Sequence, residues 1–340
     1  MIARFFHAWE RRLSSVDTNR VVRPFEWGLD WIDLDSGLDK PPADPLQRVA
    51  AWTADVMAAS DRFYASPPTE EFEQNGDLIR FPSALASPHP ENNVVQARLF
   101  PAQGNNGDRR RAVIVVPQWN SDAQGHVGLC QLFARFGITA LRMTMPYHDV
   151  RRPPDMARAD YIVSANIGRT IHANRQGVLD IRRAVDWLAA QGYERIGVQG
   201  TSLGSCLAAL AMAHDSRIVA GAFAHVSPYF ADVVWRGLST RHVRAGLEGH
   251  VTLDTLRQCW MPISPWPFID RITDRPMLNL YATYDLTFPV DLSRWYLEEL
   301  ARRQVEADIR VLPCGHYTSG RAPFKFLVGY YLTRFLMKAL

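Results

Sequence analysis

Short apolar runs alternate with amphipathic segments along the chain from Ala112 onward. The segments between the runs space their apolar residues as helices do, and the runs are AVIVVP, ITALRMTMP, RIGVQG, IVAGAFAHVS, PMLNLYATYD and ADIRVLP. Strands that read as continuous apolar runs are typical of a parallel sheet buried on both faces. The pattern therefore predicts an α/β fold in which a mostly parallel sheet carries helices on both faces.

The residues before Ala112 predict two different kinds of structure. Asn75-Gly76 lies between EFEQ and DLIRF, which indicates a hairpin, and NNVVQARLF follows as a further strand. Residues 1–66 are predicted to form a helical extension whose aromatic side chains make one buried face on a domain that spans residues 67–340. Such a row of aromatic side chains less often forms a surface that binds a partner or a membrane.

Residues 228–274 break the alternation of strands and helices and carry several prolines together with Trp235, Trp260 and Trp266. We interpret this segment as a cap inserted over the carboxyl edge of the sheet, where insertions usually shape a pocket. Its tryptophans are more often packing residues than substrate contacts, and Trp235 is the one that we assign to the substrate site.

Composition narrows the class of partner. The chain has 340 residues, 47% of them hydrophobic, and 38 basic residues against 35 acidic ones give a formal charge of +3. This excess is too small to indicate nucleic acid as a partner, so we expect a small molecule. The sequence has no uninterrupted apolar run long enough to span a membrane, and MIARFFHAWERRLSS lacks the apolar core of a secretory signal. Four widely spaced cysteines indicate a reduced, cytoplasmic protein without a metal site.

The stretch VQGTSLGSCLAAL contains the serine on which the functional prediction depends. It predicts a strand, a tight turn and a helix, with Ser202 at the turn inside Gly-x-Ser-x-Gly. The hydroxyl could cap the helix, or it could be a nucleophile held in a strained turn. A nucleophilic serine needs a base that an acid orients. Asp285 follows the strand PMLNLYATY and His316 follows the last predicted strand, so both are candidates, with Asp232 and Asp274 as the fallback acids.

The chain resembles an α/β-hydrolase over about residues 75–340, through GTSLG at 200–204, YDLTFP at 284–289 and CGHYT at 314–318. Its broad layout is similar to the esterase and dienelactone-hydrolase-like branches. The resemblance implies an eight-stranded sheet, a triad of Ser202, His316 and Asp285 in the chain order Ser, Asp, His, and ester or amide hydrolysis without a cofactor.

The resemblance also implies two backbone N–H donors that stabilise the oxyanion formed when the serine attacks a carbonyl. One belongs to the residue after the nucleophile, Leu203. The other belongs to the loop after AVIVV, which here reads PQWNSDAQGH and lacks the His-Gly pair of many relatives. We predict Trp119 as the second donor, with Gln118 as the alternative.

Two further positions are candidates for substrate contacts. His225 closes the strand IVAGAFAH at the predicted site, where pocket lining and a hydrogen-bonded core position are equally expected. Tyr147 lies in PYHDVRRPP, whose charged residues could face the pocket, although a solvated loop is the commoner explanation.

Together these residues predict a serine hydrolase that cleaves small carboxylic esters through an acyl-enzyme. A peptidase or an acyltransferase on the same fold remains an alternative. A catalytically silent scaffold that binds a partner through its amino-terminal segment and cap is a further alternative. The oligomeric state is not predicted.

Overall fold

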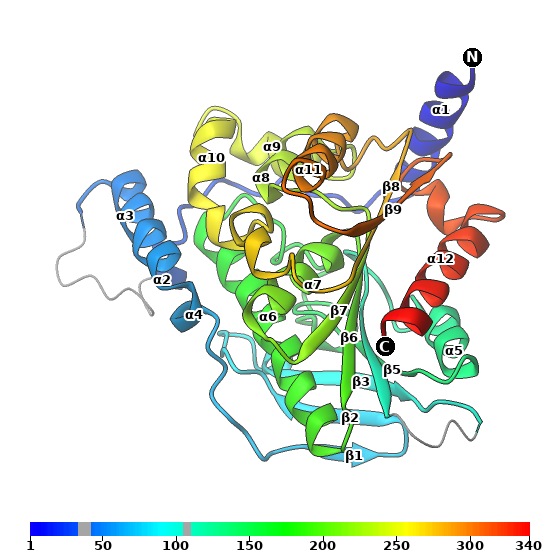
Figure 1. Ribbon diagram of the computed structural model, residues 1–340. Helices are drawn as coiled ribbons and strands as arrows, with labels where there is room; N and C mark the ends of the chain where they lie inside the picture. The colour runs from blue at the N-terminus through cyan, green and yellow to red at the C-terminus, as the bar shows by residue number, and fades with distance from the viewer. Residues whose placement is uncertain (33–41, 105–109) are drawn as a thin grey trace.

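The computed structural model describes residues 1–32, 42–104 and 110–340, and a single sheet of nine strands organises them (Figure 1). The strand order is β1-β2-β3-β5-β4-β6-β7-β8-β9. The strands are β1 (Glu73–Asn75), β2 (Leu78–Pro82), β3 (Val94–Phe100), β4 (Arg111–Val116), β5 (Thr139–Met143), β6 (Arg195–Thr201), β7 (Ile218–Ala224), β8 (Met277–Ala282) and β9 (Ala307–Leu312).

The sheet is antiparallel from β1 to β5 and parallel from β5 to β9. Each of the six apolar runs forms one of its parallel strands, which confirms the predicted α/β class. The sheet has nine strands rather than the eight implied by resemblance. The extra strand is β1, whose three exposed residues pair with β2 across the turn that contains Gly76 at φ 60°.

Helices cover both faces of the sheet (Figure 1). On one face lie α5 (Val127–Arg135) and α12 (Phe324–Ala339), and on the other lie α6 (Ile167–Ala190) and α7 (Leu203–His214). Alternate residues of β4 face the two layers, because Ile114 and Val116 belong to the core cluster on the α6 side while Val113 and Val115 belong to the cluster on the α12 side. A further helix, α11 (Val290–Arg302), connects β8 to β9.

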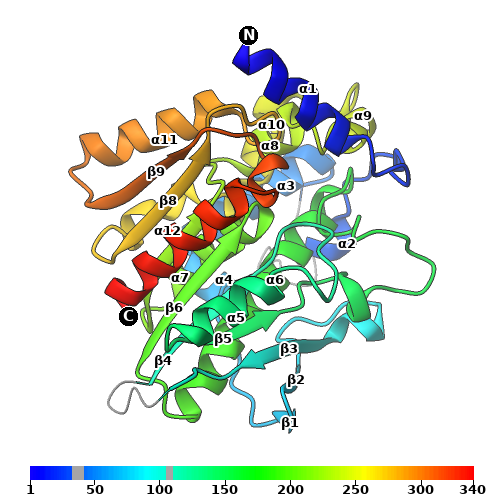
Figure 2. The ribbon, with the colours of Figure 1, turned by 90° about the vertical axis from the view of Figure 1, so that its right-hand side faces the viewer.

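The amino-terminal segment contains α1 (Ile2–Ser14), α2 (Leu29–Ile32), α3 (Pro45–Ala58) and α4 (Ser60–Phe63), with irregular chain between α1 and α2. Its aromatic residues do not form the one buried face that we predicted. Trp52 joins the core cluster on the α6 side, Phe6 packs against the α12 side, and Phe5 is 62% exposed. Figure 1 shows α1 and α3 on opposite sides of the molecule, and Figure 2 shows α1 running across its top.

Residues 228–274 lie between β7 and β8 and form α8 (Phe230–Arg236), α9 (Arg241–Leu247) and α10 (Leu253–Cys259), followed by two short 3-10 helices, η4 (Met261–Ile263) and η5 (Trp266–Arg271). Other short 3-10 helices are η2 (Pro90–Asn93), η3 (Asp149–Arg151) and η6 (Thr318–Gly320). Within the described ranges, no helix combines the length and apolar character that crossing a bilayer requires.

Candidate active site

Ser202 lies at the turn between β6 and α7 in a conformation that side chains rarely adopt, with φ 56° and ψ −122°. Its hydroxyl makes no capping hydrogen bond to α7, so the simple helix-cap interpretation does not describe it. Instead, Ser202 Oγ lies 2.9 Å from His316 Nε2. A strained turn that turns a serine hydroxyl toward an imidazole is typical of a nucleophile elbow.

The two glycines of GTSLG are required by close backbone contacts. A Cβ at Gly200 would lie 2.3 Å from the carbonyl oxygen of Gly204. A Cβ at Gly204 would lie 2.2 Å from the carbonyl oxygen of Val116 and 2.4 Å from that of Pro117. Glycine at both positions therefore lets α7 start directly against β6 and against the loop that follows β4.

Asp285 completes a hydrogen-bonded chain to Ser202. Its Oδ2 lies 2.9 Å from His316 Nδ1, and its Oδ1 accepts the backbone N–H groups of Thr287 and Phe288, each at 2.7 Å. An ionised carboxylate can only accept hydrogen bonds, so His316 carries a proton on Nδ1 and its Nε2 is free to accept the Ser202 O–H. The structure thus brings the three predicted residues together.

The environment of Asp285 keeps its carboxyl ionised. Burial alone would raise its pKa, but the neighbouring His316 and the hydrogen bonds from His225 and His316 outweigh burial and hold the pKa well below its usual range. The carboxylate therefore stays charged over the pH range in which a histidine base operates.

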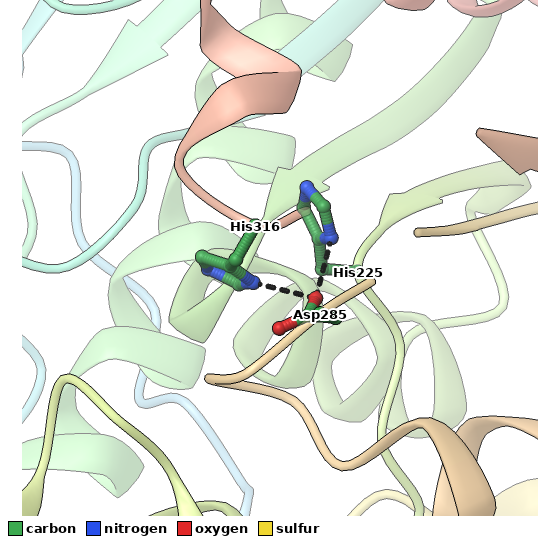
Figure 3. Close-up of side chains that lie close together, drawn as sticks. All are labelled: His225, Asp285 and His316. Carbon is green, nitrogen blue, oxygen red and sulfur yellow. Dashed lines mark hydrogen bonds and ion pairs between the residues drawn. The ribbon is translucent and has the colours of Figure 1, made fainter. Parts of the chain in front are cut away.

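His225 is the second histidine bound to Asp285, and it is almost fully buried at the wall of the cleft beside Ser202. Its Nδ1 lies 3.1 Å from Asp285 Oδ2, and its Nε2 lies 2.8 Å from the Ser319 hydroxyl. Burial, and then the nearby His316, lower the pKa of the His225 imidazole. Figure 3 shows both histidine rings directed at one carboxylate. His225 combines the two roles that we expected, because its ring is hydrogen-bonded at both nitrogens and the residue also lines the cleft beside Ser202.

His225, Asp285 and His316 are also the one group of three within the described residues whose ligand atoms lie close enough to hold a metal ion. Both Nδ1 atoms, however, lie at hydrogen-bonding distance from Asp285 Oδ2. A ring nitrogen that donates to a carboxylate carries a proton and cannot at the same time ligate a metal. Hydrogen bonding therefore accounts for this cluster.

The predicted oxyanion donors lie beside Ser202. Gln118 and Trp119 line the same cleft as Ser202 and His316, and the contacts of Gly204 with Val116 and Pro117 place their loop against the start of α7. Within the described chain, the backbone N–H groups of Leu203, Gln118 and Trp119 have no hydrogen-bond acceptor. Since the indole N–H of Trp119 donates to the Ala159 carbonyl, only its backbone N–H is free.

Asn120 and His148 hold the predicted oxyanion loop in place. The Asn120 N–H donates to His148 Nε2 at 2.8 Å, and His148 Nδ1 lies 2.8 Å from the Pro146 carbonyl. Burial lowers the pKa of His148 to about 4, so the ring is neutral and can accept this hydrogen bond. The Asn120 side chain in turn accepts the Ala159 N–H at 2.9 Å.

The segment PYHDVRRPP is only in part the solvated loop that we expected, because Val150 and Arg152 are exposed while other residues are buried. Arg151 is fully buried and forms an ion pair of 2.8 Å with Asp180, which is also buried. Tyr147 is buried as well, and its hydroxyl lies 3.3 Å from His89 Nδ1. Partners inside the protein thus explain why Arg151 and Tyr147 are buried in a segment whose charges predict a surface.

A cleft of about 1420 Å³ opens beside Ser202 and continues between α5 and α12. Neither Tyr147 nor Trp235 lines it, so the structure does not bring these two predicted substrate contacts to the cleft. Trp235 lies under the Arg244 guanidinium, at 5.3 Å. Among the described residues, Ser239 is the one residue of the predicted cap that lines the cleft. Asp17 and Arg20 of the amino-terminal segment also line it.

The fallback acids lie outside the site. Asp232 forms ion pairs with Arg257, at 2.6 Å, and Arg236, while Asp274 is 80% exposed beside Arg275.

Sequence reasoning also missed residues that support the site, chiefly Glu10 and Ser319. Neither has a sequence signal, because a single glutamate on an amphipathic helix and a serine in a loop are common surface residues.

Comparisons with known proteins identify the fold. No protein-family model and no curated protein sequence matches the chain. Among solved structures, Pyrococcus horikoshii acylaminoacyl peptidase is similar at 16% identity and a TM-score of 0.59. The match covers 79% of this chain but only 42% of the length of the peptidase. A Pyrococcus furiosus esterase is similar at 15% identity and a TM-score of 0.53, over 79% of this chain and 91% of the esterase. A lipase in its open form is similar at 11% identity and a TM-score of 0.55, over 76% of this chain and 97% of the lipase. The chain therefore has the α/β-hydrolase fold.

Proposed function

We propose that the protein is a serine hydrolase that cleaves carboxylic esters of small molecules through an acyl-enzyme. The observation that carries this proposal is the 2.9 Å contact between Ser202 Oγ and His316 Nε2, on a ring whose Nδ1 lies 2.9 Å from Asp285 Oδ2. A neutral serine is a poor nucleophile, and this arrangement supplies the base that activates it.

In the proposed reaction, Ser202 Oγ attacks the ester carbonyl carbon while His316 Nε2 takes the hydroxyl proton. The negative charge moves to the carbonyl oxygen, where the N–H of Leu203 and that of Trp119 or Gln118 stabilise it. When the C–O bond to the alcohol breaks, His316 returns the proton to the departing oxygen. Water then attacks the acyl-enzyme by the same route and regenerates Ser202.

Esters are favoured over peptides by the extent of the structural matches. The esterase and the lipase align over nearly their whole length, whereas more than half of the peptidase lies outside its match. We also propose a reducing compartment such as the cytoplasm, because all four cysteines are free and buried.

Labelling with a fluorophosphonate probe tests the proposal. We expect covalent modification of the wild-type protein at Ser202, none in Ser202→Ala, and wild-type labelling in Asp274→Asn, which changes an exposed carboxylate outside the site. Absence of labelling in the wild type would favour the silent scaffold. A series of p-nitrophenyl esters of increasing acyl length, beside matching anilides, then separates the substrate classes, and labelling without ester turnover would favour an amidase or an acyltransferase.

A further inference from the structure

The amino-terminal helix α1 reaches the loop that carries His316. Glu10 of α1 is fully buried, and both of its carboxylate oxygens accept backbone N–H groups of this loop. Oε2 accepts the N–H of Tyr317 at 2.9 Å, and Oε1 accepts the N–H of Thr318 at 2.8 Å. Charged hydrogen bonds of this kind are stronger than neutral ones, so they fix the backbone immediately after His316.

The residue before His316 also packs against this carboxylate. A Cβ at Gly315 would lie 2.4 Å from Glu10 Cδ, which means that the loop closes directly around the carboxyl group. The Gly315 N–H donates to Thr318 Oγ1 at 2.7 Å, and the Ser319 N–H donates to the Gly315 carbonyl at 3.1 Å. Glu10 therefore fills the inside of a tight turn of which His316 is part.

A second contact joins α1 to the loop of the acid. The Phe6 ring stacks on the Tyr284 ring with centroids 4.8 Å apart and an interplanar angle of 8°. Tyr284 directly precedes Asp285, and its N–H donates to the Cys314 carbonyl at 2.9 Å. One face of α1 thus contacts both loops that supply the partners of Ser202, and Figure 1 shows α1 beside the chain that leads into α12.

We propose that Glu10 is a positioning residue for His316, and that α1 thereby maintains the alignment of the base with Ser202 and Asp285. The inference rests on the proposed function. Because Glu10 touches neither Ser202 nor Asp285, it acts through the backbone on either side of His316. A base displaced by about 1 Å can lower the rate roughly 100-fold, so the support of this turn has a measurable effect on the chemical step.

Substitution of Glu10 tests the inference. In Glu10→Gln, one of the two N–H groups meets the amide NH₂ instead of an acceptor, and in Glu10→Ala both N–H groups lose their acceptor. We expect kcat for a p-nitrophenyl ester to fall about 10-fold in the first and about 100-fold in the second, with KM changing much less. The rate of fluorophosphonate labelling should fall in parallel, because it depends on the same base. Glu10→Asp, which keeps both acceptor oxygens, should recover part of the rate.

Arg11→Ala is the matched control, because Arg11 is an exposed neighbour on the same helix. Unchanged kcat in both Glu10→Gln and Glu10→Ala would overturn the inference. A raised KM at constant kcat, or failure of Glu10→Gln to fold, would also overturn it, because Glu10 would then serve the cleft or general stability. Failure of the proposed function is distinguishable, since the wild type itself would then neither label at Ser202 nor turn over an ester.

Discussion

His225 and His316 share one acceptor, because the Nδ1 atoms of both rings lie within 3.1 Å of Asp285 Oδ2. The ring centroids of the two histidines are 4.2 Å apart. A carboxylate oxygen that accepts two hydrogen bonds is less basic toward each donor than an oxygen that accepts one. His225 therefore moderates the influence of Asp285 on His316 without contacting Ser202.

Replacing His225 should alter the pH dependence of the proposed activity. In His225→Leu, His316 is the only histidine that donates to Asp285 Oδ2. The carboxylate then stabilises the protonated form of His316 more than it does in the wild type. We expect the acidic limb of the kcat/KM profile to move to higher pH. His225→Asn is the matched variant, because its amide N–H can stand where the ring N–H was, and its profile should stay near that of the wild type. Identical profiles for His225→Leu and wild type would contradict this role.

Asp285→Asn should remove most of the proposed activity while leaving the fold intact. An amide has a single acceptor oxygen, and when this oxygen accepts the N–H groups of Thr287 and Phe288, the NH₂ faces His316 Nδ1 and cannot accept its proton. The proton on His316 Nδ1 is then no longer secured. We expect kcat to fall by about 10⁴-fold, as the loss of the orienting carboxylate does in serine triads generally. Ester hydrolysis measured beside Asp274→Asn is the check. A loss smaller than tenfold would mean that another acid orients the base.

Gly204→Ala should prevent the strand and the helix from meeting. The new Cβ would lie 2.2 Å from the Val116 carbonyl oxygen, and a backbone atom cannot move aside as a flexible side chain can. We expect the free energy of unfolding to fall by about 1–3 kcal/mol and labelling of Ser202 to be lost. Gly128→Ala in α5 is the control, because nothing lies within 4 Å of its Cβ, and its thermal unfolding should be unchanged or slightly higher. Equal stability of the two variants would refute the packing argument.

Stability should decline as the pH falls from about 6.5 to about 4. Burial lowers the pKa of four histidines, His126, His148, His214 and His242, to about 4 in the folded chain, against an ordinary value near 6.5. In this pH window the unfolded chain therefore binds protons that the folded chain does not. The free energy of unfolding has its highest value above about pH 6.5 and decreases below it. Asp285 adds to the loss only at lower pH, because its pKa is below the usual carboxyl value.

Urea unfolding between pH 7.5 and 4.5 measures this decline. His214→Asn should lose less stability across the window than the wild type, because one of the four protonation sites is gone. His250→Gln, which replaces an exposed histidine, should follow the wild-type curve. A wild-type free energy of unfolding that does not change with pH in this range would exclude the buried neutral histidines.

The sheet was predictable because the signals that define it are local. Strands covered on both faces must be apolar throughout, so β4 to β9 each form a continuous apolar run in the sequence. The turn at Ser202 needs glycines, and these are close to Ser202 in the chain. His316 and Asp285 were found because each follows a parallel strand, and such strands end at one edge of the sheet.

The supports of the site were not predictable for the opposite reason. Glu10 meets Tyr317 across 307 residues, and nothing in the sequence around either of them indicates the contact. The charged neighbours of Arg151 predict a solvated loop, but its partner Asp180 lies on α6 and offsets part of the cost of burial. Long-range pairing of polar groups leaves no periodic pattern, so hydrophobic spacing could not indicate these contacts.

The contact between Glu10 and the last loop has a consequence for biosynthesis. The ribosome synthesises α1 long before Tyr317 and Thr318, so the Glu10 carboxylate meets these N–H groups only after about 300 further residues have been added. A nascent chain that already carries Ser202 lacks His316, the proposed base, and its support until that moment. We expect the nascent polypeptide to remain unreactive until α1 and the loop around His316 come together.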